Sequence, residues 1–132
     1  MKLVIELDPK TKKNSQRVFV NPRTGKPFIV PSKAYKDYEE QCRWYVPHFD
    51  EPIRGPVNVK AVFYMSTRRR VDLVNLEEAL LDILVHLRVL DDDNSKVVAS
   101  MDGSRVDYDK EYPRTEVMIS AIKEEKNGKA DK

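Results

Sequence analysis

The sequence predicts a single α+β domain in which a mixed β-sheet carries two main helices. Its 132 residues suit one compact domain, and a hydrophobic content of 40% is enough for a packed core. Apolar and polar residues alternate over 57–65, which is typical of a strand. Apolar residues recur every three or four positions over 33–45 and 72–87, which is typical of amphipathic helices. The predicted strands outnumber the helices and some follow one another directly, which favours this fold class.

Turn and capping residues set the expected limits of the elements. Asn21-Pro22 and Gly25 separate two short strands of a hairpin, Ser32 suits a helix N-cap, and Pro47 ends the helix that follows. Residues 1–122 form the expected domain, and 123–132 are expected to be a disordered tail. In chain order, we expect a strand over 3–7, hairpin strands over 17–20 and 28–30, a helix over 33–45, a strand over 57–65, a helix over 72–87, an extended segment over 96–101 and a last strand over 115–122.

Charge is divided unevenly between the two parts of the chain. Residues 1–70 hold 15 Lys/Arg against 7 Asp/Glu, a net of +8, and residues 71–132 hold 9 against 15, a net of −6. A basic surface beside clustered carboxylates is typical of enzymes that bind phosphates and hold a divalent cation. Ordinary solvated charge is the alternative, because a bias along the chain does not show which residues meet in space.

The composition excludes several kinds of site. A single Cys42 with only His48 and His86 cannot form an internal disulfide or a Cys/His zinc cluster, so any metal must be held by oxygen. The sequence has no glycine-rich phosphate loop and too little His for a Ser/His or Cys/His catalytic centre. It also has no apolar run near the roughly 18 residues that span a membrane, and too short an apolar start for a secretory signal, so we expect a cytoplasmic protein.

Acidic residues around the second predicted helix are the main candidates for chemistry. Asp72 lies where this helix begins, so it is either the helix N-cap, which the sequence favours, or a metal ligand. Asp91, Asp92 and Asp93 are adjacent carboxylates, which repel one another unless a cation or basic groups neutralise them. A solvated loop is the alternative for this run.

Two basic segments accompany these acids. Arg68, Arg69 and Arg70 stand directly before the helix, and guanidinium groups bind phosphate oxygens in bidentate fashion. A second basic loop lies over 10–17. Together the two segments predict contact with phosphates.

On a helical wheel, the side chains of the second helix separate into three stripes, one of which is apolar and faces the core. The other two are a polar stripe and a narrower apolar stripe. The polar stripe consists of Asn75, Glu78, Asp82 and His86. The narrower apolar stripe consists of Val74, Leu81 and Val85. A helix packed on only one sheet does not need this second apolar stripe, so it is either a subunit interface or covered by a loop or the other helix.

Spaced segments around the same helix form a recognisable pattern: RRRVDLVN over 68–75, ALLDIL over 79–84 and VLDDD over 89–93. Together they resemble the RusA family of Holliday junction resolvases. That family has an arginine-rich approach to a D-x-D-N helix start, an A-L-x-D-x-L helix and a G-V-[ILW]-x-D-D loop. The chain is also similar to phage-type members in KKNS over 12–15, SKAY over 32–35 and DGSR over 102–105.

The resemblance implies a small homodimer that binds four-way DNA junctions and makes paired cuts with Mg²⁺. It implies that Asp72, Asp92 and Asp93 hold the metal, and we add Glu78 to the catalytic set as a candidate replacement carboxylate. The register between Asp92 and Asp93 is open, because the loop has one extra residue. The residues expected to contact DNA are Arg68, Arg69, Arg70, Lys12, Lys13, Asn14 and Lys96.

Two positions depart from the family's pattern. Asp72 matches the first Asp of D-x-D-N, so the second Asp falls on Val74, and the family's catalytic lysine falls on Glu78. In one interpretation Glu78 replaces the missing carboxylate, while Lys13 or Lys96 supplies the missing cation. In the other, Val74 and Glu78 mark a site that has lost activity.

We therefore expect a magnesium-dependent endonuclease that resolves four-way DNA by paired phosphodiester hydrolysis in recombination and repair. One alternative is a branched-DNA-binding protein with weak cleavage. Another is a non-enzymatic interaction protein whose acidic loop docks a basic partner. Salt dependence separates the last from the others, because binding to phosphates weakens steeply as salt is added.

Overall fold

The computed structural model describes residues 1–12 and 16–123, without the side chains at 16, 17, 29 and 31. Lys13, Asn14 and residues 124–132 of the expected tail lie outside the described residues. The elements are β1 (Lys2–Ile5), β2 (Gln16–Val20), β3 (Pro27–Pro31), α1 (Lys33–Cys42), the 3₁₀ helix η2 (Arg43–Tyr45), β4 (Val57–Met65), α2 (Leu73–His86), β5 (Val98–Ser100), β6 (Arg105–Tyr108) and β7 (Arg114–Ala121). They confirm the predicted α+β class.

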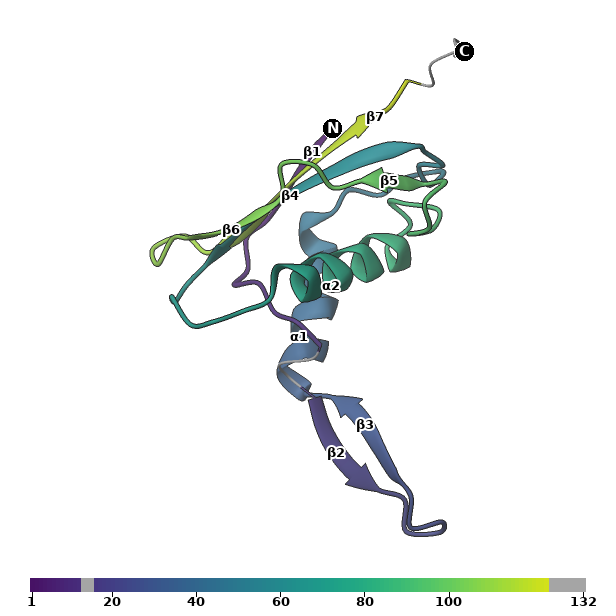
Figure 1. The fold of residues 1–132 in the computed structure, drawn as a ribbon, viewed down its shortest axis with the longest axis vertical. Helices are drawn as coiled ribbons and strands as arrows, with labels where there is room; N and C mark the ends of the chain where they lie inside the picture. The colour runs from purple at the N-terminus through teal and green to yellow at the C-terminus, as the bar shows by residue number, and fades with distance from the viewer. Residues whose placement is uncertain (13–15, 124–132) are drawn as a thin grey trace, which may run out of the picture.

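A five-stranded mixed sheet forms the centre of the fold (Figure 1). β7 lies between β1 and β4 and is antiparallel to both. β5 and β6 run parallel to β4 and pair with successive parts of its other edge. β4 is therefore the central strand, as its length and clean alternation lead one to expect.

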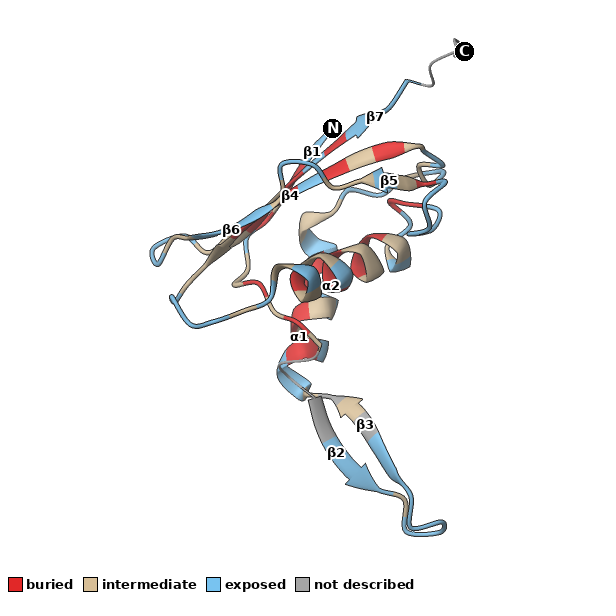
Figure 2. Ribbon diagram, viewed as in Figure 1, coloured by how far each residue is buried: buried red, intermediate tan, exposed pale blue. Residues whose placement is uncertain are grey.

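The alternation along β4 decides which face of the sheet is covered. Val59, Ala61 and Phe63 point to one face, and all three are buried. They pair with residues of β7 that are also buried. Both helices lie on the same side of the sheet (Figure 1), and their buried residues, red in Figure 2, belong to the same core cluster as those of β4 and β7. This single layer of helices on one face places the core between α1, α2 and the sheet.

Each helix begins as the sequence predicts. The Ser32 hydroxyl accepts a hydrogen bond from the Tyr35 backbone N–H at 3.2 Å, which caps α1. The α-helical part of α1 ends at Cys42, and η2 continues to the predicted end at Tyr45. The stripe of α2 that faces the core consists of Leu76, Ala79, Leu80, Ile83 and Leu84.

The sequence misses β6 and overestimates β1. Three of the four side chains of β6 are exposed, so this edge strand has no buried face to produce an alternating pattern. β1 ends at Ile5 because the chain then turns toward the end of β4. There the Asp8 carboxylate accepts hydrogen bonds from the backbone N–H and hydroxyl of Ser66, at 3.1 and 2.7 Å.

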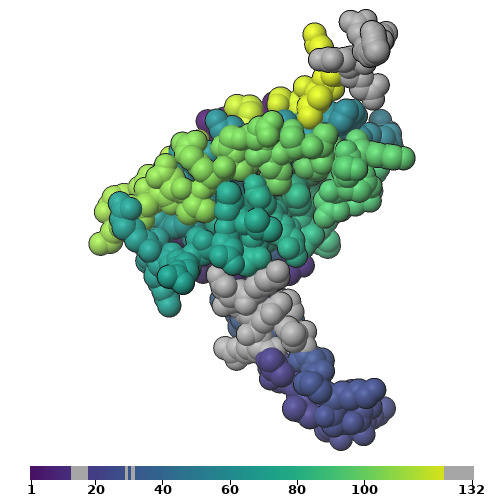
Figure 3. All heavy atoms as spheres, in the orientation of Figure 1, coloured from purple at the N-terminus to yellow at the C-terminus, as the bar shows by residue number. Residues whose placement is uncertain are grey.

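β2 and β3 form a separate two-stranded sheet that projects away from the rest of the molecule (Figures 1 and 3). The sequence predicted this hairpin. Of the helices described, none has the length and apolar character needed to cross a membrane.

Candidate functional site

Asp72 occupies the N-cap position of α2 without capping the helix. Its backbone is extended, with φ −89° and ψ 125°, but its side chain accepts no hydrogen bond from the first turn of the helix backbone. The carboxylate instead accepts a hydrogen bond from Asn75 Nδ2 at 3.2 Å. The capping role that the sequence favoured is therefore wrong, and the carboxylate is exposed beside the start of α2.

A basic cleft adjoins this end of α2. It has a volume of about 430 Å³ and lies between the N-terminal loop, which contributes Lys10, and the segment before α2, which contributes Arg69 and Arg70. Arg68 lies outside this cleft, with its guanidinium 4.2 Å from the centre of the Tyr108 ring. The two arginines and the lysine give the cleft the charge and donor geometry that bind phosphate.

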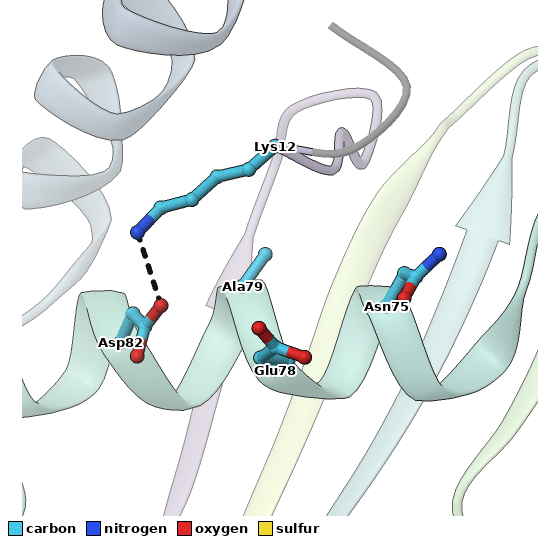
Figure 4. Close-up of a pocket in the computed structure, with 5 residues that line it drawn as sticks. All are labelled: Lys12, Asn75, Glu78, Ala79 and Asp82. Atoms are coloured by element: carbon cyan, nitrogen blue, oxygen red, sulfur yellow. Dashed lines mark hydrogen bonds and ion pairs between the residues drawn. The ribbon is translucent and has the colours of Figure 1, made fainter. Parts of the chain in front are cut away.

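A small polar pocket lies further along α2 (Figure 4). Asn75, Glu78 and Asp82 line it from successive turns of the helix, and Lys12 enters from the N-terminal loop. The Lys12 ammonium donates a hydrogen bond to Asp82 Oδ2 at 3.1 Å. Lys12, predicted to contact DNA, is thus engaged by a carboxylate in this structure. Its ammonium approaches the helix face that carries Glu78.

The acidic loop follows α2 and turns back toward the same helix. Asp92 accepts hydrogen bonds from the Asp93 backbone N–H at 2.7 Å and from Asn94 Nδ2 at 3.1 Å. Desolvation raises the pKa of Asp93, and a hydrogen bond with the Asp92 side chain and the negative charges of Asp92 and Asp82 raise it further. Asp93 therefore experiences negative charge from both Asp92 and Asp82.

The three predicted metal ligands do not meet within one chain. Asp72 precedes α2, whereas Asp92 and Asp93 follow this helix of 14 residues. Among the described residues, no three acidic, histidine or cysteine side chains are placed to hold a metal ion. Because Mg²⁺ needs oxygen ligands at roughly 2.0–2.1 Å, a cation shared by all three residues does not fit a single chain.

The predicted DNA-contacting residues fall in different places. Arg69 and Arg70 lie together in the basic cleft. Lys96 is exposed at the end of the acidic loop, where its backbone N–H bonds to Asn94 Oδ1 at 2.9 Å. Lys13 and Asn14 lie outside the described residues.

Asp82 lies in the polar pocket, although the sequence did not predict it as a metal ligand or a DNA contact. Its position on the polar stripe and inside the ALLDIL segment is the signal that points to it. Its contact with Lys12 joins residues 70 positions apart, so no local pattern predicts it.

The narrow apolar stripe of α2 is only partly exposed. Leu81 and Val85 are half-buried and pack against the core, whereas Val74, near Asp72, is 68% exposed. The stripe is thus partly covered by the chain's own core.

Comparison with known proteins finds one matching family model. The model described as Endodeoxyribonuclease RusA matches residues 6–120. This range includes the basic cleft, the polar pocket, the acidic loop and every described element except β1 and the last residue of β7. No curated protein matches the chain.

Proposed function

The chain belongs to the RusA endodeoxyribonuclease family, and from this premise we propose that it is a magnesium-dependent endonuclease that resolves four-way DNA junctions by paired cuts. One observation carries the proposal. The basic cleft of Lys10, Arg69 and Arg70 lies directly before the exposed carboxylate of Asp72. Cations that bind a phosphate and a carboxylate that can hold a metal are thereby neighbours.

The proposed roles follow from these positions. Arg69 and Arg70 bind the DNA backbone and orient a phosphate toward the start of α2. Contacts of this kind carry no base information, so selectivity for a junction comes from DNA shape. Asp72 holds the cation at this end, and Asp92 and Asp93 hold it from the acidic loop. When bound, Mg²⁺ supplies an activated water and stabilises charge on the phosphate.

We also propose that the protein is a homodimer in which Asp72 of one subunit lies beside the acidic loop of the other. Support comes from the placement of the two sets of ligands before and after α2, and from the described residues of one chain, among which no three acidic, histidine or cysteine side chains are placed to hold a metal ion. The exposure of Val74 near Asp72 offers an apolar contact at this position. A two-fold dimer would contain two such sites, which is what paired cuts require.

A second candidate is a protein that binds branched DNA and cuts it poorly. Val74 and Glu78 favour it, because both stand where the family pattern has functional residues. Both candidates predict junction binding, so cleavage is the property that separates them.

Junction cleavage with and without Mg²⁺ tests the proposal. We expect the natural chain to cut a four-way junction only with Mg²⁺. We expect Asp72→Asn to abolish cutting while it keeps or improves binding, because it removes an anionic ligand without removing a phosphate contact. Asp50→Asn is the matched control, since Asp50 is exposed and lies far from α2 in the sequence. Unchanged cleavage by Asp72→Asn would contradict the site, and absence of Mg²⁺-dependent cleavage would favour the second candidate.

A further inference from the structure

The ribbon formed by β2 and β3 is built unlike the rest of the protein. Its strands pair only with each other in the described sheets, and it extends well beyond the body of the molecule (Figure 3). A two-stranded hairpin of this kind is marginally stable in water unless something packs against it.

Apolar side chains are exposed on both faces of the ribbon. In strand order Val18 and Val20 point to one face and Phe19 to the other. Phe19 pairs with Phe28 across the strands, and their rings stack with centroids 5.9 Å apart. Val18, Phe19, Val20 and Phe28 are 69%, 46%, 62% and 46% exposed. Exposed apolar side chains on both faces of so small an element indicate an interaction site.

The tip of the ribbon is a defined turn. Asn21 and Lys26 pair through a backbone hydrogen bond of 2.9 Å, and Asn21 Oδ1 accepts from the Arg23 N–H at 2.9 Å. Gly25 has φ +69°, a conformation that favours glycine, and its N–H bonds to the Asn21 carbonyl at 2.8 Å. The turn presents Pro22, Arg23 and Lys26 as exposed side chains.

Charge identifies the partner that suits this surface. Between Asp8 and Asp37 the sequence has eight Lys/Arg and no Asp or Glu. Such a segment attracts a polyanion, and a second copy of the same ribbon would be repelled. A groove of duplex DNA admits a two-stranded β-ribbon, and DNA-binding proteins use apolar side chains such as Phe and Pro against base steps.

We propose that the β2–β3 ribbon is a DNA-binding arm that lies in a groove of one duplex arm of the junction. Arg23 and Lys26 contact phosphates, and Pro22 at the tip and the Phe19–Phe28 pair pack against sugars and base edges. The proposal rests on the proposed action on branched DNA, and it adds a contact surface separate from α2 and the basic cleft.

The salt dependence of binding tests the arm. Affinity for a four-way junction is measured without Mg²⁺ over a range of salt concentrations, for the natural chain and for Arg23→Ala with Lys26→Ala. The double variant should bind more weakly, with a slope of log affinity against log salt shallower by about 2, because each lost phosphate contact removes nearly one released counterion. Arg43→Ala with Arg54→Ala is the control, since it removes two exposed charges outside the ribbon and should leave the slope unchanged.

Phe19→Ser with Phe28→Ser tests the apolar contact in the same assay. We expect weaker binding with an unchanged slope, because no charge is removed. A second copy of the chain is the competing occupant of the ribbon. Sedimentation of all the variants tests it, because sedimentation measures self-association. The proposal would be overturned if the ribbon variants bound the junction with the same affinity and the same salt slope as the natural chain. It would also be overturned if the variants lost self-association while DNA binding stayed intact.

The outcomes also distinguish this proposal from the proposed function. A natural chain that binds junctions without cutting them would reject the nuclease proposal. The salt slopes of the variants would still show whether the β2–β3 ribbon contacts DNA. A natural chain that binds no branched DNA would reject both.

Discussion

Glu78 adds a carboxylate to a helix face where the family pattern has a lysine. Lys12 approaches the same face from the N-terminal loop and bonds to Asp82 at 3.1 Å (Figure 4). Val74 removes a carboxylate one turn before Glu78. Glu78 thus keeps the number of acids that Val74 reduces, whereas the family's lysine has no counterpart at its position. In the interpretation of a rearranged site, Glu78 replaces the carboxylate that Val74 lacks.

Substitution of Glu78 tests the rearrangement. Glu78→Ala should weaken activation by Mg²⁺ sharply, because affinity for a hard cation depends on the number and charge of its oxygen ligands. Ala is at least as good a helix former as Glu and Glu78 is exposed, so α2 should remain intact. The measurement is the Mg²⁺ concentration needed for half-maximal nicking of a four-way junction.

A variant that restores the residues of the family pattern at positions 74 and 78 is the matched comparison. If Val74 and Glu78 mark a lost site, Glu78→Lys with Val74→Asp should cut faster than the natural chain. Normal cleavage by Glu78→Ala would show that Glu78 is a solvated carboxylate with no part in the site.

At the scale of residues, the sequence predicted which residues are candidates for the site better than it predicted which residues they contact. The spacing of the segments that resemble the family pattern singled out Asp72, Asp92 and Asp93. The same spacing could not show that Asp72 bonds to Asn75 instead of capping α2, since both uses begin from the same position. Nor could it show the Lys12–Asp82 pair, whose two members are distant in sequence.

At the scale of elements, α2 determines how far apart the candidate ligands lie. Its buried stripe fixes it on the sheet, and the polar pocket lies beside this stripe, because Ala79 belongs to both. Any loss of packing along this stripe therefore acts on the site through the position of the whole helix.

Leu80→Ala tests how strongly α2 is held. Leu80 is 2% exposed, and its truncation should lower the free energy of unfolding by about 2–5 kcal/mol, because it removes apolar contacts and leaves a cavity. His86→Ala on the same helix should change it by no more than about 0.5 kcal/mol, since His86 is exposed. Urea unfolding followed by circular dichroism gives both values. Equal effects would mean that α2 does not pack as described.

Elements with one buried face were predictable from sequence. β4 alternates and both helices have a three- to four-residue period, and these patterns follow directly from burial on one side. β6 has little burial, so no pattern marked it. The β2–β3 hairpin was predicted, but its projection was not, because Val18 and Val20 give the pattern of a strand whose face is buried.

At the scale of the whole molecule, the uneven charge along the chain becomes two separate regions. The basic cleft lies at the start of α2 and the acidic loop at its end. The sequence predicted both kinds of charge, but not that a helix of 14 residues would separate them. The composite site proposed above takes one region from each of two chains.

Complementation between inactive subunits tests this composite site. One subunit carries Asp72→Asn and the other carries Asp92→Asn with Asp93→Asn. They are co-expressed with different tags and purified through both, so that only mixed dimers remain. Each variant alone should be inactive, because every site in its own dimer lacks one set of ligands.

The mixed dimer should recover Mg²⁺-dependent nicking of one strand without paired cuts. If a site takes Asp72 from one subunit and the acidic loop from the other, one of its two sites has every natural ligand and the other has none. If each site lies within one chain, both sites of the mixed dimer lack ligands. A mixed dimer as inactive as its parents would therefore reject the composite site, and failure to isolate any mixed dimer would reject the homodimer itself.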